Sequence, residues 1–216
     1  MIEKGTVKIL IFDFDGVIVE SNGIKDAAFR ELFSRFPDQL EEMMQYHKEN
    51  VSASRVFKFN YLLSLLGKEG DEQLHKQLMT DFSVITLNLM KQVPLVTGAL
   101  TFLNNWPQIP KYLASVTPIE DLTVILENLG LTAYFKGVYG CPPWTKPNAI
   151  RDILLQEKSD PSKALLIGDS AGDQRSAKET GVHFLARNSG LAFDEPLPIS
   201  FPDLNILATY YKENIL

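Results

Sequence analysis

Two aspartates follow the first apolar segment of the chain and are the strongest candidates for chemistry. Asp13 and Asp15 interrupt the segment KILIFDFDGVIVE, residues 8–20. On an extended strand, side chains two residues apart point to the same side, so the two carboxylates lie next to each other. One carboxylate can attack an electrophile because it is ionised at neutral pH, while its neighbour can transfer a proton. The pair therefore predicts covalent and acid–base catalysis at the end of a strand.

Further polar residues are predicted to meet this pair, because ligands of open parallel sheets bind beyond the carboxyl ends of the strands. Ser115 and Asp169 follow predicted strands, Asp173 lies one helical step after Asp169, and Lys146 lies in a loop that reaches the same edge. Each pair of carboxylates about 4 Å apart repels by about 4 kcal/mol at an effective dielectric near 20. The group therefore predicts a hard divalent cation, most simply Mg²⁺. Lys146 and Ser115 then suit the anionic oxygens of a phosphate.

Five short apolar segments have the length and boundaries of buried parallel strands. Helical patterns at 121–130 and 173–181 separate the later ones. Strands that alternate with helices indicate an α/β fold with a Rossmann-like parallel sheet. The proline-rich stretch 193–202 is expected to be a loop before a final helix. The expected strands are 7–14, 111–116, 137–140, 163–169 and 182–187.

The connection between the first two strands has a different character. Apolar residues at helical spacing predict helices over 24–36, 55–66 and 71–90, the last one capped by Asp71. A parallel pair needs a crossover of only about a dozen residues, so this connection is long enough for a separate domain. We expect an α/β core domain of residues 1–19 and 93–216 with an inserted all-α domain of residues 20–92.

Composition narrows the class of protein. The 216 residues carry a net charge of −6, which argues against a nucleic-acid partner bound through its phosphates. The single cysteine, Cys141, rules out an internal disulfide and suits a reducing compartment. No apolar run approaches the ~20 residues of a membrane span. We expect a cytoplasmic enzyme with no membrane partner, and its oligomeric state stays open.

Four short motifs resemble those of the haloacid dehalogenase superfamily, in the same order and with comparable spacing. They are DFDGV at 13–17, LASVT at 113–117, TKP at 145–147 and IGDSAGD at 167–173. The helical insert matches the position and type of the C1-type cap of that superfamily. The chain is similar to the members of β-phosphoglucomutase and phosphoglycolate phosphatase type.

The resemblance implies a role for each core residue. Asp13 would form an aspartyl-phosphate and ligate Mg²⁺, and Asp15 would be the general acid and base and offer its backbone carbonyl to the metal. Asp169 would complete the protein ligands of the metal. The remaining residues are Ser115 and Lys146, which would hold the phosphoryl oxygens, and Asp173, which would hold Lys146 or a metal-bound water.

The resemblance also suggests substrate contacts in the cap. Lys25 falls where related phosphomutases carry a histidine that faces the active site. The stretch ENVSASR, residues 49–55, resembles their substrate-contacting turn but is two residues longer. Arg55, Ser52 and Asn50 are therefore candidates for contact with the leaving group. For Arg55, the alternative is a solvent-exposed residue at the start of a helix.

Three functions follow from these residues. The first is a Mg²⁺-dependent phosphatase that hydrolyses a small phosphorylated metabolite through an aspartyl-phosphate. The second is a phosphomutase of the β-phosphoglucomutase type, which would share every core residue. The third is a non-catalytic phosphate-sensing or signalling domain. Dehalogenases and phosphonate hydrolases of the superfamily lack the second aspartate, which is present here as Asp15.

Overall fold

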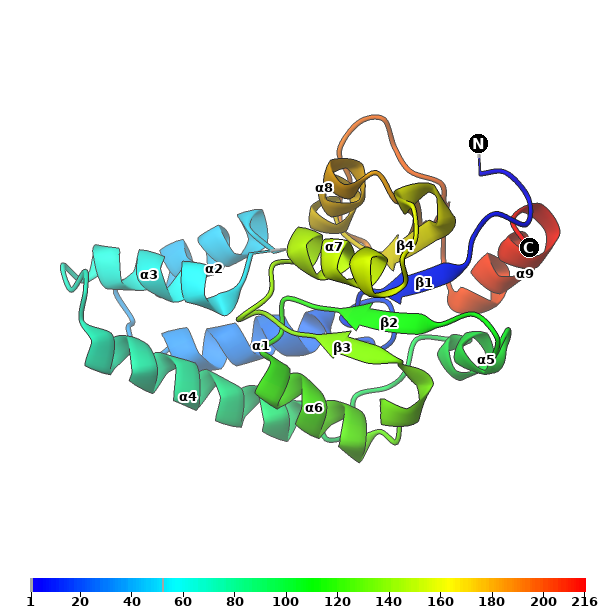
Figure 1. The fold of residues 1–216 in the computed structure, drawn as a ribbon. Coiled ribbons are helices and arrows are strands. Elements are labelled where there is room, and N and C mark those ends of the chain that lie inside the picture. The colour runs from blue at the N-terminus through cyan, green and yellow to red at the C-terminus, as the bar shows by residue number, and fades with distance from the viewer. Residues whose placement is uncertain (1, 52) are drawn as a thin grey trace. The chain divides into compact units, whose positions relative to one another are not determined.

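The computed structural model describes residues 2–51 and 53–216, and the chain divides into two compact units (Figure 1). The core unit contains the chain up to Glu20 and from Pro94 onward, and the helical unit contains Ser21–Val93. The expected boundaries lie one residue from these. The expected α/β class of the core unit is confirmed by its parallel sheet.

The core unit is built on a six-stranded parallel sheet with the strand order β3-β2-β1-β4-β5-β6. The first strand lies in the middle, where Ile11 pairs with Tyr112 of β2 on one side and with Leu166 of β4 on the other. The strand order reverses at this point, so the loops after β1, β2 and β4 share one crevice at the carboxyl edge. The strands are β1 (Ile9–Phe12), β2 (Lys111–Ala114), β3 (Gly137–Tyr139), β4 (Ala164–Gly168), β5 (His183–Arg187) and β6 (Ser200–Phe201).

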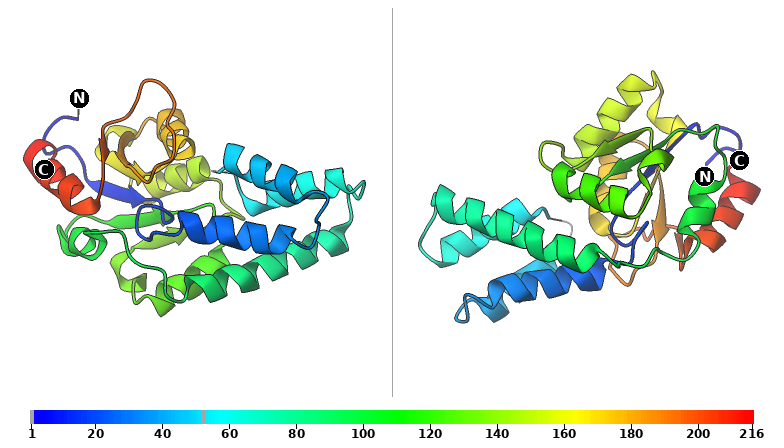
Figure 2. Two further views of the ribbon diagram at one scale, coloured as in Figure 1. Left: turned by 180° about the vertical axis from the view of Figure 1, so that it is seen from behind. Right: turned by 90° about the horizontal axis from the view of Figure 1, so that it is seen from below.

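Helices cover both faces of this sheet (Figures 1 and 2). Ile9 and Ile11 point to one face, where they pack with Ile150 and Ile153 of α7. Phe12 points to the other face and meets Phe102 of α5 with ring centroids 5.6 Å apart. The alternation of side chains along β1 therefore supplies both halves of the core. The helices are α5 (Ala99–Asn104), α6 (Ile119–Asn128), α7 (Lys146–Gln156), α8 (Ala171–Thr180) and α9 (Leu204–Asn214), with the 3₁₀ turns η1 (Thr132–Tyr134) and η2 (Pro161–Lys163).

The expectation of a loop over 193–202 is wrong for part of this stretch, because Ser200–Phe201 form the sixth strand. Ser200 pairs with Ala186, and the N–H of Asn188 donates to the carbonyl of Phe201 at 2.7 Å. This strand has only two residues and is flanked by prolines, so no alternating pattern marks it in the sequence. Its pairing with β5 is a tertiary contact that local propensity does not predict.

The helical unit contains α1 (Asn22–Phe33), α2 (Leu40–Glu49), α3 (Arg55–Leu65) and α4 (Glu72–Met90), and its described residues contain no strand. The expected cap of the last helix is confirmed, since the Asp71 carboxylate accepts the N–H of Leu74 at 2.9 Å. The helix α2 lies between the first two predicted helices. Aromatic side chains from three helices form the centre of the unit, with Phe29 next to Phe33, Phe59 and Phe82.

None of the helices in residues 2–51 and 53–216 combines the length and the apolar character that a membrane crossing requires.

Candidate active site

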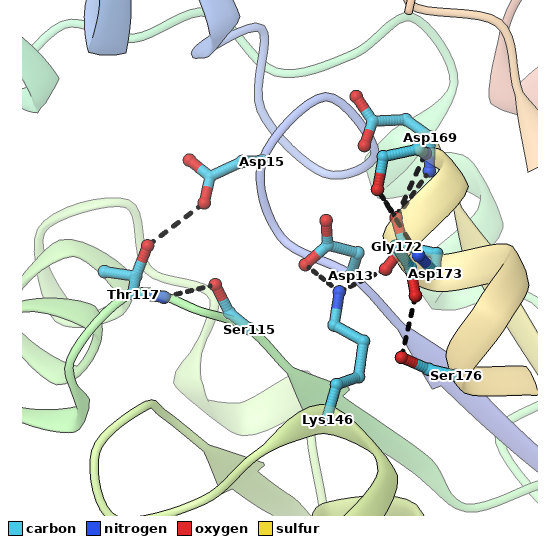
Figure 3. Close-up of polar contacts among 10 residues, drawn as sticks. Asp13, Asp15, Ser115, Thr117, Lys146, Asp169, Gly172, Asp173 and Ser176 are labelled. Carbon is cyan, nitrogen blue, oxygen red and sulfur yellow. Dashed lines mark hydrogen bonds and ion pairs between the residues drawn. The ribbon is translucent and has the colours of Figure 1, made fainter. Parts of the chain in front are cut away.

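The loops at the carboxyl edge of the sheet bring the predicted polar residues of the core unit together (Figure 3). Asp13 and Asp15 follow β1, Ser115 follows β2 and Asp169 follows β4. All of these side chains are buried. The group also contains Lys146 and Asp173, which stand at the N-terminal ends of α7 and α8.

Lys146 is the central cation of this group. Its Nζ lies 2.9 Å from Oδ1 of Asp13 and forms an ion pair with Oδ1 of Asp173. Thr145 caps the helix α7 by accepting the N–H of Asn148, and the proline after Lys146 suits the first turn. Lys146 is therefore the first residue of a helix and does not lie in the loop expected from the sequence.

Asp173 combines a structural role with its contact to Lys146. Its Oδ2 accepts the backbone N–H of Asp169 at 3.2 Å, the N–H of Ser170 at 3.1 Å and the hydroxyl of Ser170 at 2.7 Å. Ser170 in turn accepts the N–H of Asp173, which completes a capping box at the start of α8. Asp173 thus orients the backbone beside Asp169, and Asp169 itself does not cap the helix.

The backbone of Gly168 packs against Asp173. A Cβ atom on Gly168 would lie 2.3 Å from Cβ of Asp173, closer than real Cβ contacts come. A side chain at this position would push Asp173 out of place. This close packing against Asp173 explains why the first glycine of the IGDSAGD motif, Gly168, has no room for a side chain.

Thr117 contacts the second aspartate and was not among the predicted site residues. Its Oγ1 donates to Oδ2 of Asp15 at 3.0 Å, and its backbone N–H donates to Oγ of Ser115 at 3.0 Å. Thr117 is the last residue of the LASVT motif. Its position two residues after Ser115 was the only indication in the sequence that it contacts this group. Ser115 does not cap α6, because the N-cap of that helix is Pro118.

The electrostatics of the group are dominated by burial and by the crowding of carboxylates. Burial raises the pKa of Asp13 to about 8, and the charges of Asp173, Asp169 and Asp15 add to the rise while Lys146 opposes it. Burial alone lowers the pKa of Lys146, but the carboxylates of Asp13 and Asp173 outweigh it and hold that pKa above its usual range. A further positive charge at this position would lower the pKa of Asp13 and favour its ionised form.

Three of the carboxylates could hold a metal ion. Oxygens of Asp13, Asp169 and Asp173 lie within 4.8 Å of one another, and all three residues are buried. Because Asp173 already bonds Lys146 and the start of α8, Asp13 and Asp169 are the better ligands. Hard divalent cations prefer such oxygen donors, and a cation here would stabilise the ionised form of Asp13. The residues present fit a metal ion.

The residues of the helical unit that were predicted to contact the substrate differ in their surroundings. Lys25 lies in the first turn of α1 and is half-buried. Arg55 is buried, donates to Oγ of Ser83 at 2.7 Å and lies 4.7 Å above the ring of Phe82. The alternative that Arg55 is a solvent-exposed residue at the start of a helix is therefore wrong, because its side chain is buried. Asn50 donates to the carbonyl of Tyr46, and Ser52 lies outside the described residues.

Comparisons with known proteins identify the family. Phosphoglycolate phosphatase of Vibrio parahaemolyticus is 28% identical over 211 residues, covering 91% of this chain and 90% of that protein. A haloacid dehalogenase-like hydrolase structure from Streptococcus pneumoniae has a TM-score of 0.71 at 20% identity and covers 95% of this chain and 99% of that one. The β-phosphoglucomutase structure from Clostridium difficile has a TM-score of 0.71 at 16% identity, with 84% and 85% covered. The model of the haloacid dehalogenase-like hydrolase family matches residues 10–187, and the chain belongs to this family.

Proposed function

We propose that the protein is a Mg²⁺-dependent phosphatase that hydrolyses a small phosphorylated metabolite through an aspartyl-phosphate. The observation that carries this proposal is the contact of Lys146 with Asp13, beside the carboxylates of Asp169 and Asp173. This arrangement combines a nucleophile, a cation for phosphoryl oxygens and an oxygen site for a metal.

In the first step, an oxygen of Asp13 attacks the phosphorus atom and forms an acyl phosphate as the bond to the leaving oxygen breaks. Asp15 gives its proton to that oxygen, so the product leaves as an alcohol. The hydrogen bond from Thr117 holds the Asp15 carboxyl on the side of Ser115. Ser115 and Lys146 would bind the phosphoryl oxygens and offset their growing charge.

In the second step, water attacks the phosphorus atom of the acyl phosphate, and Asp15 takes the proton from that water. The bond from phosphorus to the Asp13 oxygen breaks, which restores the carboxylate and releases inorganic phosphate. When bound by Asp13 and Asp169, Mg²⁺ would supply positive charge to the carboxylates and to the phosphoryl group.

The substrate is proposed from a relative and from the helical unit. Phosphoglycolate is the first compound to test, because the relative from Vibrio parahaemolyticus is named for it. We propose that Lys25 and Arg55 contact the part of the substrate that leaves. A single cysteine suits a cytoplasmic setting, which we propose for the enzyme.

A panel of phosphate esters with and without Mg²⁺ tests this function. The wild-type protein should release phosphate from 4-nitrophenyl phosphate and from at least one metabolite, and EDTA should stop the release. Asp13→Asn should lower the rate at least about 1000-fold by loss of the nucleophile. The control is Asp160→Asn, an exposed residue of the core unit, which should retain the wild-type rate.

A covalent test adds to the kinetics. Mass spectrometry of the protein quenched in acid during turnover should find phosphate on the peptide that contains Asp13. Hexose 1-phosphate should give free phosphate; accumulation of hexose 6-phosphate would instead establish a phosphomutase. Failure to release phosphate from any ester in the presence of Mg²⁺ would reject both enzyme activities.

A further inference from the structure

Arg187 lies at the carboxyl edge of the sheet and takes no part in the chemistry proposed above. It is the last residue of β5 and is buried. Its guanidinium uses three nitrogen atoms. Nη1 donates to the carbonyl of Gly16 at 3.2 Å and to Oε2 of Glu20 at 3.0 Å, Nη2 donates to Oε1 of Glu20, and Nε donates to the carbonyl of Pro202 at 3.3 Å.

The segment that Arg187 holds carries the second aspartate. Between Phe14 and Glu20 the chain makes a tight turn, in which the N–H groups of Ile18 and Val19 both donate to the carbonyl of Phe14. Gly16 stands next to Asp15 with φ of +72°, and its N–H donates to the carbonyl of Val19 at 2.8 Å. Asp15 is therefore part of a compact turn, and its backbone direction depends on the shape of that turn.

Arg187 fastens this turn at two points. One is the carbonyl of Gly16, immediately after Asp15, and the other is the carboxylate of Glu20 at the end of the segment. At the same end, the N–H of Glu20 donates to the carbonyl of Pro94 at 2.9 Å, where the chain returns to the core unit. The turn is thus fixed to the rigid end of β5 as well as to the returning chain.

The chemistry of the contact favours arginine over any other residue. A planar guanidinium can bind both oxygens of a carboxylate and still donate to carbonyls, which an ammonium cannot do with the same geometry. The side chain of Arg187 is 11% exposed and that of Glu20 is 40% exposed, whereas in the pair of Arg151 and Glu179 both side chains are more than half exposed. The Arg151 pair is therefore a matched surface control.

We infer that Arg187 is a positioning residue for Asp15, holding the turn after β1 so that the carboxyl group of Asp15 stays aligned with the leaving oxygen. This inference rests on the proposed phosphatase function. Arg187 does not touch the reacting atoms, and it acts through the backbone of Gly16 and through Glu20.

Phosphate esters with good and poor leaving groups distinguish a positioning role of Arg187 from a general contribution to the stability of the protein. A nitrophenolate leaves readily without a proton, whereas an alkoxide needs the proton that Asp15 supplies. Misplacement of Asp15 should therefore lower kcat/KM far more for an alkyl phosphate than for 4-nitrophenyl phosphate. A loss of folded protein lowers both rates by the same factor.

The experiment compares kcat/KM of the wild type, Arg187→Lys, Arg187→Met and Arg151→Met on 4-nitrophenyl phosphate, phenyl phosphate and the best alkyl phosphate from the panel. Arg187→Met should lose on the order of tenfold more activity on the alkyl ester than on the nitrophenyl ester, since positioning errors commonly cost this much or more. Arg187→Lys should show a smaller difference of the same sign. If Arg187→Met does not fold, the rates of Arg187→Lys on the three esters test the inference in its place. Arg151→Met should match the wild type on all three esters.

A second arm uses Glu20→Gln alone and combined with Arg187→Met. The double variant should lose less than the product of the two single losses on the alkyl ester, because both changes release the same turn. Equal losses on the three esters, or independent effects of the two substitutions, would overturn the role of Arg187. A wild-type protein with no activity on any ester would overturn the phosphatase function itself.

Discussion

The ammonium of Lys146 lies 2.9 Å from Oδ1 of Asp13 and also pairs with Asp173, so one cation serves two buried carboxylates. Such a cluster is costly to disrupt because each charge has been removed from water. The charge that suits Lys146 to phosphoryl binding therefore also supports the fold of the loops around it.

Lys146→Met tests both roles of this cation. Without added metal, we expect the free energy of unfolding to fall by about 3 kcal/mol, because two buried carboxylates lose their partner. Activity should fall at least about 100-fold. Urea denaturation in EDTA measures the first effect and phosphate release measures the second.

The matched control is Lys163→Met, because Lys163 forms an exposed pair with Asp160 at 3.7 Å. That change should alter the free energy of unfolding by less than about 1 kcal/mol. Millimolar Mg²⁺ should recover part of the stability lost in Lys146→Met and none in the control. An equal loss of stability in both variants would contradict the importance of the buried cluster.

Thr117→Val tests the hydrogen bond to Asp15. The substitution keeps the shape of the side chain but removes the hydroxyl that donates to Oδ2 of Asp15 at 3.0 Å. We expect kcat/KM for an alkyl phosphate to fall by about tenfold, because a single charge-assisted hydrogen bond is worth about 1.5 kcal/mol or more. Steady-state kinetics measure this loss.

Thr123→Val is the control for that change, since Thr123 donates to a backbone carbonyl within α6 and is exposed. Its kinetic constants should stay at the wild-type values. Should Thr117→Val retain full activity on the alkyl ester, the contact with Asp15 would have no catalytic importance.

The clustering of the candidate site residues at one edge of the sheet was largely predictable from the sequence, and the contacts that support them were not. Asp13, Asp15 and Asp169 follow buried apolar strands, and parallel strands present such positions at one edge whatever the details of packing. The contact between Glu20 and Arg187 joins residues 167 positions apart, which no local pattern reveals. The strand β6 escaped prediction for a similar reason, since it is defined only by its partner.

Gly168→Ala tests the packing beneath the carboxylates that we propose as metal ligands. The new Cβ would overlap with Asp173, so either the strand or the capping box must move. We expect a loss of about 1–3 kcal/mol in the free energy of unfolding, together with a loss of activity as Asp173 and Lys146 shift. Gly23→Ala is the control, because its Cβ would have no atom within 4 Å and its φ is not positive. Equal stability of the two variants in urea would show that the site tolerates this displacement.

The helical unit has its own pH-sensitive group, formed by Asp26, His47 and Lys58. Lys58 Nζ lies 2.9 Å from Nδ1 of His47, whose Nε2 lies 2.7 Å from Oδ1 of Asp26. Burial lowers the pKa of Lys58 to about 7, with a further contribution from the charge of Lys25. Burial and the charge of Lys58 lower the pKa of His47 to about 4.

Both shifts make the unfolded state bind more protons than the folded state over a defined range of pH. For His47 this range runs from about pH 4 to its unfolded pKa of 6.5, and for Lys58 from about pH 7 to 10.5. Each group therefore contributes a rise of the free energy of unfolding with pH in its own range, of at most about 1.4 kcal/mol per pH unit. Lys58→Met should flatten the rise between pH 7 and 9, whereas the exposed control Lys76→Met should keep it.

Urea denaturation at pH 7, 8 and 9, followed by circular dichroism, measures the slope of the free energy of unfolding against pH. Because any hydrogen bond lost with Lys58 lowers stability about equally at each pH, the slope reports the titration alone, and an unchanged slope in Lys58→Met would show that Lys58 does not titrate in this range.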